Sequence, residues 1–289
     1  MIRLFIYLLL FLQLSINSCL AERISAEDQR ILKKFWQYAE ATHLSDLAVN
    51  ERIPLIAEFF IDTPYRSNTL EAKREELPVI NLHEFDCVTF VENVLALAYL
   101  PEYHAQAADK FVNNIIRLRY RNGEILDYTS RLHYSSDWLY EMERQHLLTD
   151  ITAFTGGIVY PNQVNYMSKN FMRYPPLQKD SVLKEKMKII ETDINRRTYH
   201  FIPKQSIDQA CDKIKNGDVL LITTNIKGLD TSHLGFAYKQ GGKTYLLHAS
   251  SKSKKVTLTE VPLQEYMEGI SSQSGIMVAR AIKTICTEK

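Results

Sequence analysis

The 289-residue chain has no excess of charge of either sign and no long apolar run after its first residues. Lys and Arg total 35 and Asp and Glu total 34, for a net charge of +1. This balance gives no support to nucleic-acid binding, which needs a basic excess or stripe. The chain also lacks internal repeats, low-complexity tracts and Pro/Gly/Ser-rich linkers. We therefore expect one domain over residues 22–289, with no nucleic acid as partner.

The N-terminus has the features of an export signal. Arg3 provides a short positive region, an apolar run covers residues 4–14, and small residues follow at Ser18 and Ala21. The run of about eleven residues would cross only half a bilayer as a helix, so we expect no transmembrane span after signal removal. These features predict a signal peptide over residues 1–21 and an exported protein, periplasmic or secreted.

The segment just before the expected cleavage site leaves an alternative open. Ile16-Asn17-Ser18-Cys19 resembles a loose lipobox, in which Cys19 would carry a lipid anchor. The protein would then be an outer-membrane-anchored lipoprotein. In both cases it leaves the cytoplasm.

Cysteine is scarce, with four residues in the whole chain. Apart from Cys19, these are Cys87, Cys211 and Cys286. In an oxidising compartment Cys211 and Cys286 could form a disulfide, although all three thiols could equally be reduced. An unpaired thiol outside the cytoplasm is a liability unless it is buried or used, so Cys87 becomes a candidate for chemistry.

The pattern of the chain changes after Cys211. Before it, a capping box at Ser25 and Asp28 predicts a helix, and apolar spacing predicts further helices near residues 53–60, 87–100, 103–121, 135–147, 162–171 and 181–196, with Pro175-Pro176 separating the last two. After it, strands are expected near 218–223, 233–238, 244–249, 255–259 and 276–281. Helices followed by a meander of strands indicate an α+β fold, with helices packed on an antiparallel sheet.

Cys87 is expected in the first turn of a buried helix. Asp86 is a good N-cap, and residues 94–100 are apolar on nearly all sides. The helix dipole favours a thiolate at this position, but the charge of Asp86 opposes it, so a neighbouring imidazole would be needed. The alternative is that Cys87 is simply a small buried apolar residue.

Two histidines lie on either side of a hairpin signal. If Gly241-Gly242 form a two-residue turn, Gly235 opposes His248, and His233 and His248 project from one face as diagonal neighbours, about 7 Å apart between backbones. A turn at Gln240-Gly241 would keep both on one face, whereas a three-residue loop would separate them.

The small residues near His233 suggest how a thiol could reach this pair. Gly235 and Ala237 are expected on the same face as His233, where they would let a helix end approach. If that helix begins at Cys87, His233 would act as the base and His248 would orient it.

Several motifs together resemble a known family. Asp86-Cys87-Val88-Thr89-Phe90-Val91, Asn216-Gly217-Asp218-Val219-Leu220 and Ser232-His233-Leu234-Gly235 resemble the signature of the NlpC-type, papain-like bacterial cell-wall cysteine hydrolases. Further segments are similar to one subgroup, the N-acetylmuramoyl-L-alanine amidase-like family: Thr63-Pro64-Tyr65, Thr69-Leu70-Glu71, Ser130-Arg131-Leu132-His133-Tyr134, Trp138, Gly228-Leu229-Asp230 and Leu247-His248-Ala249-Ser250-Ser251.

The resemblance implies a papain-like core and hydrolysis of the amide between N-acetylmuramic acid and L-alanine in a muropeptide or peptidoglycan. It also implies a Cys-His-His triad at Cys87, His233 and His248, and a role for Tyr65 in holding the oxyanion with the backbone N–H of Cys87. We expect the reaction to proceed through an acyl-enzyme, without a metal or cofactor.

A second group of residues is expected to bind substrate. Arg131 could hold a carboxylate of the stem peptide by a two-pronged contact, and Ser232 lies beside the expected base. His133, Tyr134 and Trp138 could form a wall for a sugar or an alanine methyl. Alternatively, Tyr134 and Trp138, four residues apart, pack in the core.

Other functions remain open on the sequence. A related enzyme could cut between D-glutamate and the diamino acid of the stem peptide, and the triad residues do not distinguish this endopeptidase from an amidase. The domain could also be a non-catalytic wall-binding module, or an acyltransferase, although no lipid-binding apolar segment follows the signal. A zinc amidase using His83, Cys87, His233 and His248 is disfavoured, since the chain has no His-Glu-x-x-His motif.

Overall fold

The computed structural model describes residues 24–71 and 76–282. The expected signal peptide over residues 1–21, the lipidation site Cys19 and the disulfide candidate Cys286 lie outside the described residues. Within the described ranges, no helix is long and apolar enough to cross a membrane.

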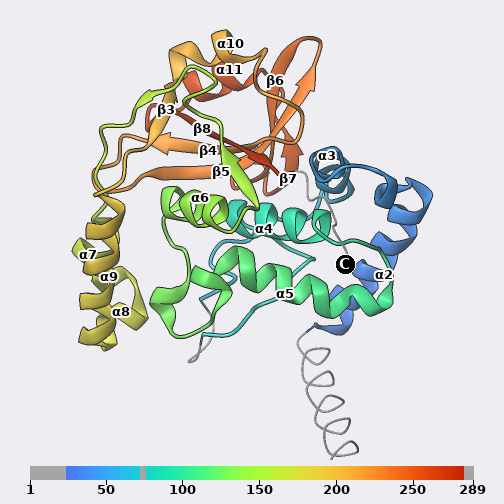
Figure 1. Cartoon of the computed structure of the whole chain (residues 1–289), viewed down its shortest axis with the longest axis horizontal. Helices are drawn as coiled ribbons and strands as arrows, with labels where there is room; N and C mark the ends of the chain where they lie inside the picture. The colour runs from blue at the N-terminus through green and yellow to red at the C-terminus, as the bar shows by residue number, and fades with distance from the viewer. Residues whose placement is uncertain (1–23, 72–75, 283–289) are drawn as a thin grey trace, which may run out of the picture.

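Most helices of the first half form one layer beneath the sheet (Figure 1). Their bounds are α2 Ala26–Ala41, α3 Val49–Phe59, α4 Cys87–Ala98, α5 Ala108–Arg119 and α6 Ser135–Arg144. A side group consists of α7 Tyr166–Lys169, α8 Pro175–Lys179 and α9 Ser181–Ile194, and α10 Ile207–Ala210 and α11 Leu263–Glu268 lie on the far side of the sheet. The Ser25 N-cap predicted for this helix is formed, because the Ser25 hydroxyl oxygen accepts from the backbone N–H of Asp28 at 3.1 Å, while the Asp28 carboxylate accepts from that hydroxyl.

The strands form one eight-stranded sheet in the order β2-β3-β8-β4-β5-β6-β7, and β1 pairs separately with β8. All of these pairings are antiparallel. The strands are β1 Leu148–Asp150, β2 Ile158–Val159, β3 His200–Pro203, β4 Val219–Thr224, β5 Thr231–Gln240, β6 Lys243–Ser250, β7 Lys255–Leu258 and β8 Gln273–Ala281. The predicted α+β class with an antiparallel sheet is thus confirmed.

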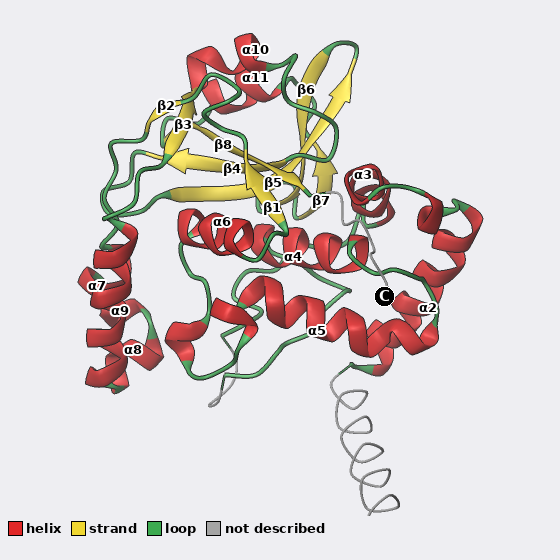
Figure 2. Ribbon diagram, in the orientation of Figure 1, coloured by secondary structure: helices red, strands yellow, loops and turns green. Residues whose placement is uncertain are grey.

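The sheet carries a different apolar core on each face, and Figure 2 shows helices on both sides of it. Leu234 and Phe236 face the large core beneath the sheet, where the Phe90 ring of α4 lies 5.7 Å from the Phe236 ring. Ala237 and Leu246 face the smaller core under α10 and α11. The alternation of side chains along each strand therefore assigns every residue of β5 and β6 to one of two compartments.

Several short elements were not predicted. The strands β1, β2 and β3 have two to four residues each, and they are stabilised by pairing at β8 or, for β2, at β3 rather than by local patterning. Pro175 and Pro176 do separate two helical segments, but they also begin the short helix α8. Proline is tolerated there because the first N–H groups of a helix have no partner within it.

Candidate active site

The N-terminus of α4 holds Cys87 in a well-capped first turn. The Asp86 carboxylate accepts from the backbone N–H of Thr89 at 2.8 Å, and the Thr89 hydroxyl accepts from the N–H of Asp86 at 3.0 Å. This reciprocal pair satisfies two donors that a helix start leaves free. The rest of α4 is buried almost throughout, as its apolar sequence predicted, so the position of Cys87 is fixed by the core.

Opposing effects act on the Cys87 thiol. The backbone N–H groups of Cys87, Val88 and Leu234 point at the sulfur and favour the thiolate. Burial and the Asp86 charge oppose them, and burial is the larger effect, raising the thiol pKa to about 12. At neutral pH the isolated site therefore holds a thiol, and a base would have to remove its proton before the sulfur could act as a nucleophile.

The two predicted histidines meet on adjacent strands. Gln240 pairs with Lys243, so the hairpin has the two-residue Gly241-Gly242 turn that the sequence predicted. Nε2 of His233 lies 2.5 Å from Nδ1 of His248, and the rings stand edge to face. Burial lowers the pKa of His233 to about 4, and burial together with the charge of His233 lowers that of His248 to about 3. Both rings are therefore neutral at physiological pH.

The path by which the thiol reaches the histidines differs from the prediction. His233 pairs with Ile222, which belongs to the core under α10 and α11, so His233 faces that side together with Ala237. The helix α4 instead packs against the opposite face, on Leu234 and Phe236. The expectation that the helix beginning at Cys87 approaches on the face of His233 was wrong for the body of α4, because the larger apolar side chains of β5 point the other way.

The thiol reaches the neighbourhood of His233 at the end of the β5–β6 pairing. The continuous pairing of these strands stops at Phe236 and Leu247. Beyond it, the backbone N–H of Leu234 points at the Cys87 sulfur. The thiol therefore meets β5 at the residue next to His233, where the two strands no longer pair.

Tyr65 is held near the start of α4, the helix that carries Cys87. Its strand-like segment bridges to Phe85, and its N–H donates to the carbonyl of Lys254 at 2.8 Å. Burial raises the pKa of Tyr65, and the nearby Cys87 and Asp86 raise it further, so the phenol is a neutral donor close to the thiol.

Tyr266 on α11 is a site residue that sequence reasoning missed. Its ring lies 5.6 Å from the His248 ring in an edge-to-face arrangement. Burial and the nearby Cys87 raise the pKa of this phenol. No local motif marks it, because α11 reaches the site only through the fold.

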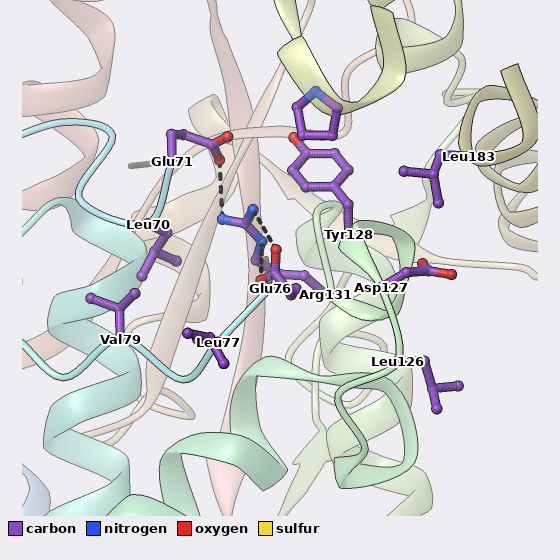
Figure 3. A pocket seen from close by; sticks show the side chains of 11 residues that line it. Leu70, Glu71, Glu76, Leu77, Val79, Leu126, Asp127, Tyr128, Arg131 and Leu183 are labelled. Carbon is purple, nitrogen blue, oxygen red and sulfur yellow. Dashed lines mark hydrogen bonds and ion pairs between the residues drawn. The ribbon is translucent and has the colours of Figure 1, made fainter. Parts of the chain in front are cut away.

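The predicted carboxylate-binding residue Arg131 is already paired. Its Nη1 lies 3.0 Å from Glu71 and its Nε lies 3.1 Å from Glu76 (Figure 3), and the side chain is buried. His133 accompanies it, with Nε2 2.8 Å from the carbonyl of Tyr128. Burial and the Arg131 charge lower the His133 pKa to about 3. The expectation that Arg131 is free to hold a substrate carboxylate requires correction, since two protein carboxylates occupy its guanidinium.

Tyr134 and Trp138 do not form the expected sugar-binding wall. Both are buried: the Tyr134 hydroxyl donates to Glu191 at 2.7 Å, and the Trp138 indole donates to the carbonyl of Leu118 at 2.8 Å. Their spacing reflects core packing, the alternative that the sequence left open. Ser232, by contrast, is exposed beside His233.

The four proposed zinc ligands are not brought together. His83 lies away from the histidine pair, with Nδ1 2.9 Å from the buried Asp28 of α2. Across residues 24–71 and 76–282, no group of three or more His, Cys, Asp or Glu side chains is placed to hold a metal ion.

Comparison with known proteins agrees with these motifs. Residues 55–276 match the family described as AmiA-like, N-acetylmuramoyl-L-alanine amidase-like. The chain belongs to this family. A crystal structure of an N-acetylmuramoyl-L-alanine amidase from Bacteroides uniformis is 36% identical, with a TM-score of 0.76 over 81% of this chain and 99% of that one.

Two further structures extend the comparison of the amidase-like fold. A protein from Bacteroides fragilis, described as a proposed xylanase, is 38% identical with a TM-score of 0.73, over 78% of this chain and 99% of that one. LPG0564 from Legionella pneumophila is 23% identical with a TM-score of 0.68, over 90% of this chain and 96% of that one, a likeness that shows the fold alone. No curated protein matches the chain.

Proposed function

We propose that this family member hydrolyses the amide between N-acetylmuramic acid and L-alanine in muropeptides, with Cys87 as nucleophile on a papain-like core. The observation that carries the proposal is a thiol at a helix start that accepts from the backbone N–H of Leu234, the residue next to one member of a hydrogen-bonded histidine pair. Family membership and the Bacteroides uniformis amidase support the choice of substrate.

The proposed mechanism gives each ring nitrogen a role. His233 donates from Nε2 to Nδ1 of His248, which leaves its own Nδ1 to take the Cys87 proton. The thiolate then attacks the lactyl carbonyl and forms a tetrahedral intermediate. The backbone N–H of Cys87 and the phenol of Tyr65 are the donors that would stabilise its oxyanion.

Breakdown of this intermediate completes the cycle. The imidazolium of His233 returns its proton to the departing amine of L-alanine, and an acyl-enzyme remains on Cys87. Water, deprotonated by the same ring, then releases the muramic acid carboxylate and regenerates the thiol. All protein groups in these steps belong to this chain. Ser232, which is exposed, lies beside His233 at the edge of the site.

Mass spectrometry of a defined disaccharide-tripeptide tests both the nucleophile and the bond. Incubation with wild type is expected to give a free L-alanyl tripeptide and a bare disaccharide, and Cys87→Ala is expected to give neither. Cys211→Ala is the matched control, because that thiol is also buried but lies against Thr244, away from the site. Release of the free diamino acid with a sugar-dipeptide would instead establish the endopeptidase.

The same experiment addresses the binding module. No cleavage by reduced, folded wild type would overturn the proposed hydrolase.

The proposed substrate lies outside the cytoplasm, and the N-terminal segment supports export to the periplasm or beyond. Fractionation of cells expressing the full chain would test this location, and Cys19→Ser would test the lipid anchor.

A further inference from the structure

Tyr266 is fixed in place by the helix that carries it. Leu263 and Met267 of α11 are both completely buried in the smaller core, and Leu246 of β6 belongs to the same core. Side chains alternate along a strand, so Leu246 and His248 project from the same face of β6, the face that α11 covers. The two apolar anchors of α11 therefore hold Tyr266 against the part of the sheet from which His248 projects.

The backbone around His248 is paired on one side only. His248 pairs with Thr257 of β7, but the pairing of β6 with β5 stops one residue earlier, at Leu247. Across residues 24–71 and 76–282, the His248 imidazole makes one hydrogen bond, between its Nδ1 and Nε2 of His233. The torsion about the Cβ–Cγ bond of a histidine has broad energy minima, so one hydrogen bond does not fix the ring. The orientation of the His248 ring therefore depends on the side chains packed against it.

Tyr266 supplies such packing. Its ring centroid lies 5.6 Å from that of His248, and the two ring planes stand at 77°. Edge-to-face contacts of this kind are attractive because the positive edge of one ring meets the negative face of the other, and they favour a particular angle between the rings. The contact therefore restrains the His248 ring in an orientation that the hydrogen bond alone does not set.

Tyr266 contacts His248 through its ring and not through its hydroxyl. In the described part of the chain, this hydroxyl makes no hydrogen bond. The phenol is nevertheless within electrostatic reach of the thiol, because the Cys87 charge, after burial, is a cause of its raised pKa. A role through the ring and a role through the hydroxyl are distinguishable, since phenylalanine can replace the first and not the second.

We propose that Tyr266 is a positioning residue, whose ring holds the His248 imidazole so that its Nδ1 meets Nε2 of His233. The proposal rests on the proposed function, in which His233 is the base. Without the Tyr266 ring, His248 would spend part of the time in orientations that leave Nε2 of His233 without its acceptor. The base would then lose the partner that fixes its tautomer and the direction of its ring. Loss of the Tyr266 ring therefore lowers kcat and leaves substrate binding unchanged.

Steady-state kinetics with the disaccharide-tripeptide test this role in turnover. Tyr266→Ala is expected to lower kcat by about threefold to tenfold, the range that an edge-to-face contact can supply, with KM within about twofold of wild type. Tyr266→Phe keeps the ring and should retain kcat within about twofold. Tyr140→Ala is the matched control and should keep the wild-type kcat, because it removes an exposed tyrosine ring of α6 that packs on Arg197 instead of on a histidine.

Nitrogen NMR tests the same role without a substrate. In protein labelled with ¹⁵N at histidine, the shifts of the ring nitrogens report which nitrogen carries a proton and whether the other accepts a hydrogen bond. Wild type, Tyr266→Phe and Tyr140→Ala are expected to show a single set of shifts, with the proton on Nε2 of His233 and with Nδ1 of His248 as acceptor. In Tyr266→Ala the signals of both rings should shift or broaden, because the His248 ring then turns.

The two measurements together decide between the outcomes. Wild-type kcat and unchanged ¹⁵N shifts in Tyr266→Ala would overturn the proposal. An equal loss of kcat in Tyr266→Phe would also overturn it and would assign the role to the hydroxyl. If Tyr266→Ala fails to fold by circular dichroism, Tyr266→Leu, which keeps apolar bulk without a planar ring, is judged by the same two measurements. Cleavage of no substrate by wild type would overturn the proposed function, while the ¹⁵N shifts would still decide whether Tyr266 positions His248.

Discussion

Nε2 of His233 lies 2.5 Å from Nδ1 of His248, and the two rings meet at 89°. One proton can lie between the two nitrogens, so one ring must donate and the other must accept. The assignment that frees Nδ1 of His233 for the thiol makes His248 the acceptor. In the proposed mechanism, His248 would thereby fix the tautomer of the base.

This relationship predicts unequal losses at the two positions. His233→Ala removes the base and should lower kcat by about 10³-fold, within the range for general-base catalysis. His248→Gln keeps a hydrogen-bond acceptor near Nε2 of His233, so we expect a loss of only about 10- to 100-fold. Steady-state kinetics of both variants, with circular dichroism to verify folding, measures the difference. Equal losses at both positions would contradict a supporting role for His248.

The raised thiol pKa predicts how Cys87 reacts with an alkylating reagent. Burial and the Asp86 charge hold this pKa at about 12, and His233 titrates near 4, so the resting pair is neutral in between. The rate of iodoacetamide labelling at Cys87 should therefore keep rising from pH 6 to pH 10. A plateau beginning below pH 6 would instead reveal a stable thiolate–imidazolium pair. Labelling of Cys87→Ala supplies the background.

Asp86 offers a way to shift this pKa without losing the helix cap. Asn is as good an N-cap as Asp, so Asp86→Asn should keep the bond to the N–H of Thr89 and preserve folding. Loss of the negative charge should lower the thiol pKa and raise the labelling rate at pH 8 several-fold. The pH profile of labelling in the variant and wild type checks this. An unchanged profile would show that the Asp86 charge does not act on Cys87.

Gly235 is required where β5 passes β6. A Cβ at this position would lie 2.8 Å from the Leu247 carbonyl oxygen and 3.0 Å from Cβ of His248. Gly235→Ala should therefore displace His248, lower kcat by more than tenfold and cost about 1–3 kcal/mol of stability. Gly241→Ala in the hairpin turn is the control, since its Cβ would meet nothing within 4 Å. Its positive φ makes it cost about 1 kcal/mol, with activity retained. Urea unfolding and kcat measure both effects.

Three histidines with lowered pKa values predict a loss of stability in acid. The pKa values of His133 and His248 are lowered to about 3 and that of His233 to about 4, below the ordinary 6.5. At a pH between the folded-state pKa of each histidine and its ordinary value of 6.5, the unfolded chain binds more protons than the folded chain. The free energy of unfolding therefore falls as pH drops below 6.5. Each histidine contributes up to about 1.4 kcal/mol per pH unit.

Urea unfolding at pH 7.5 and pH 5 measures this dependence. His133→Gln should flatten it by about one third without removing the site histidines. His43→Gln, which replaces a histidine with an 81% exposed side chain, is the comparison variant. A free energy of unfolding that is constant between pH 7.5 and pH 5 would contradict the prediction.

Local signals in the sequence were enough to predict several parts of the site. The Asp86 cap set the start of the helix that carries Cys87, and the Gly241-Gly242 turn set the register of the hairpin. Register and side-chain alternation then brought His233 and His248 together. These features depend on hydrogen bonds between neighbouring residues or across a two-residue turn, so a short stretch of sequence determines them.

The tertiary structure decided what these elements meet. Which face of β5 receives α4 depends on the total apolar area of Leu234, Phe236 and their neighbours across the sheet, not on the small residues beside His233. Burial likewise removed Tyr134 and Trp138 from any substrate surface. Tyr266 reached His248, and Glu71 reached Arg131, over separations of 18 and 60 residues. No local pattern encodes such contacts, because they follow from how two cores share the two faces of one sheet.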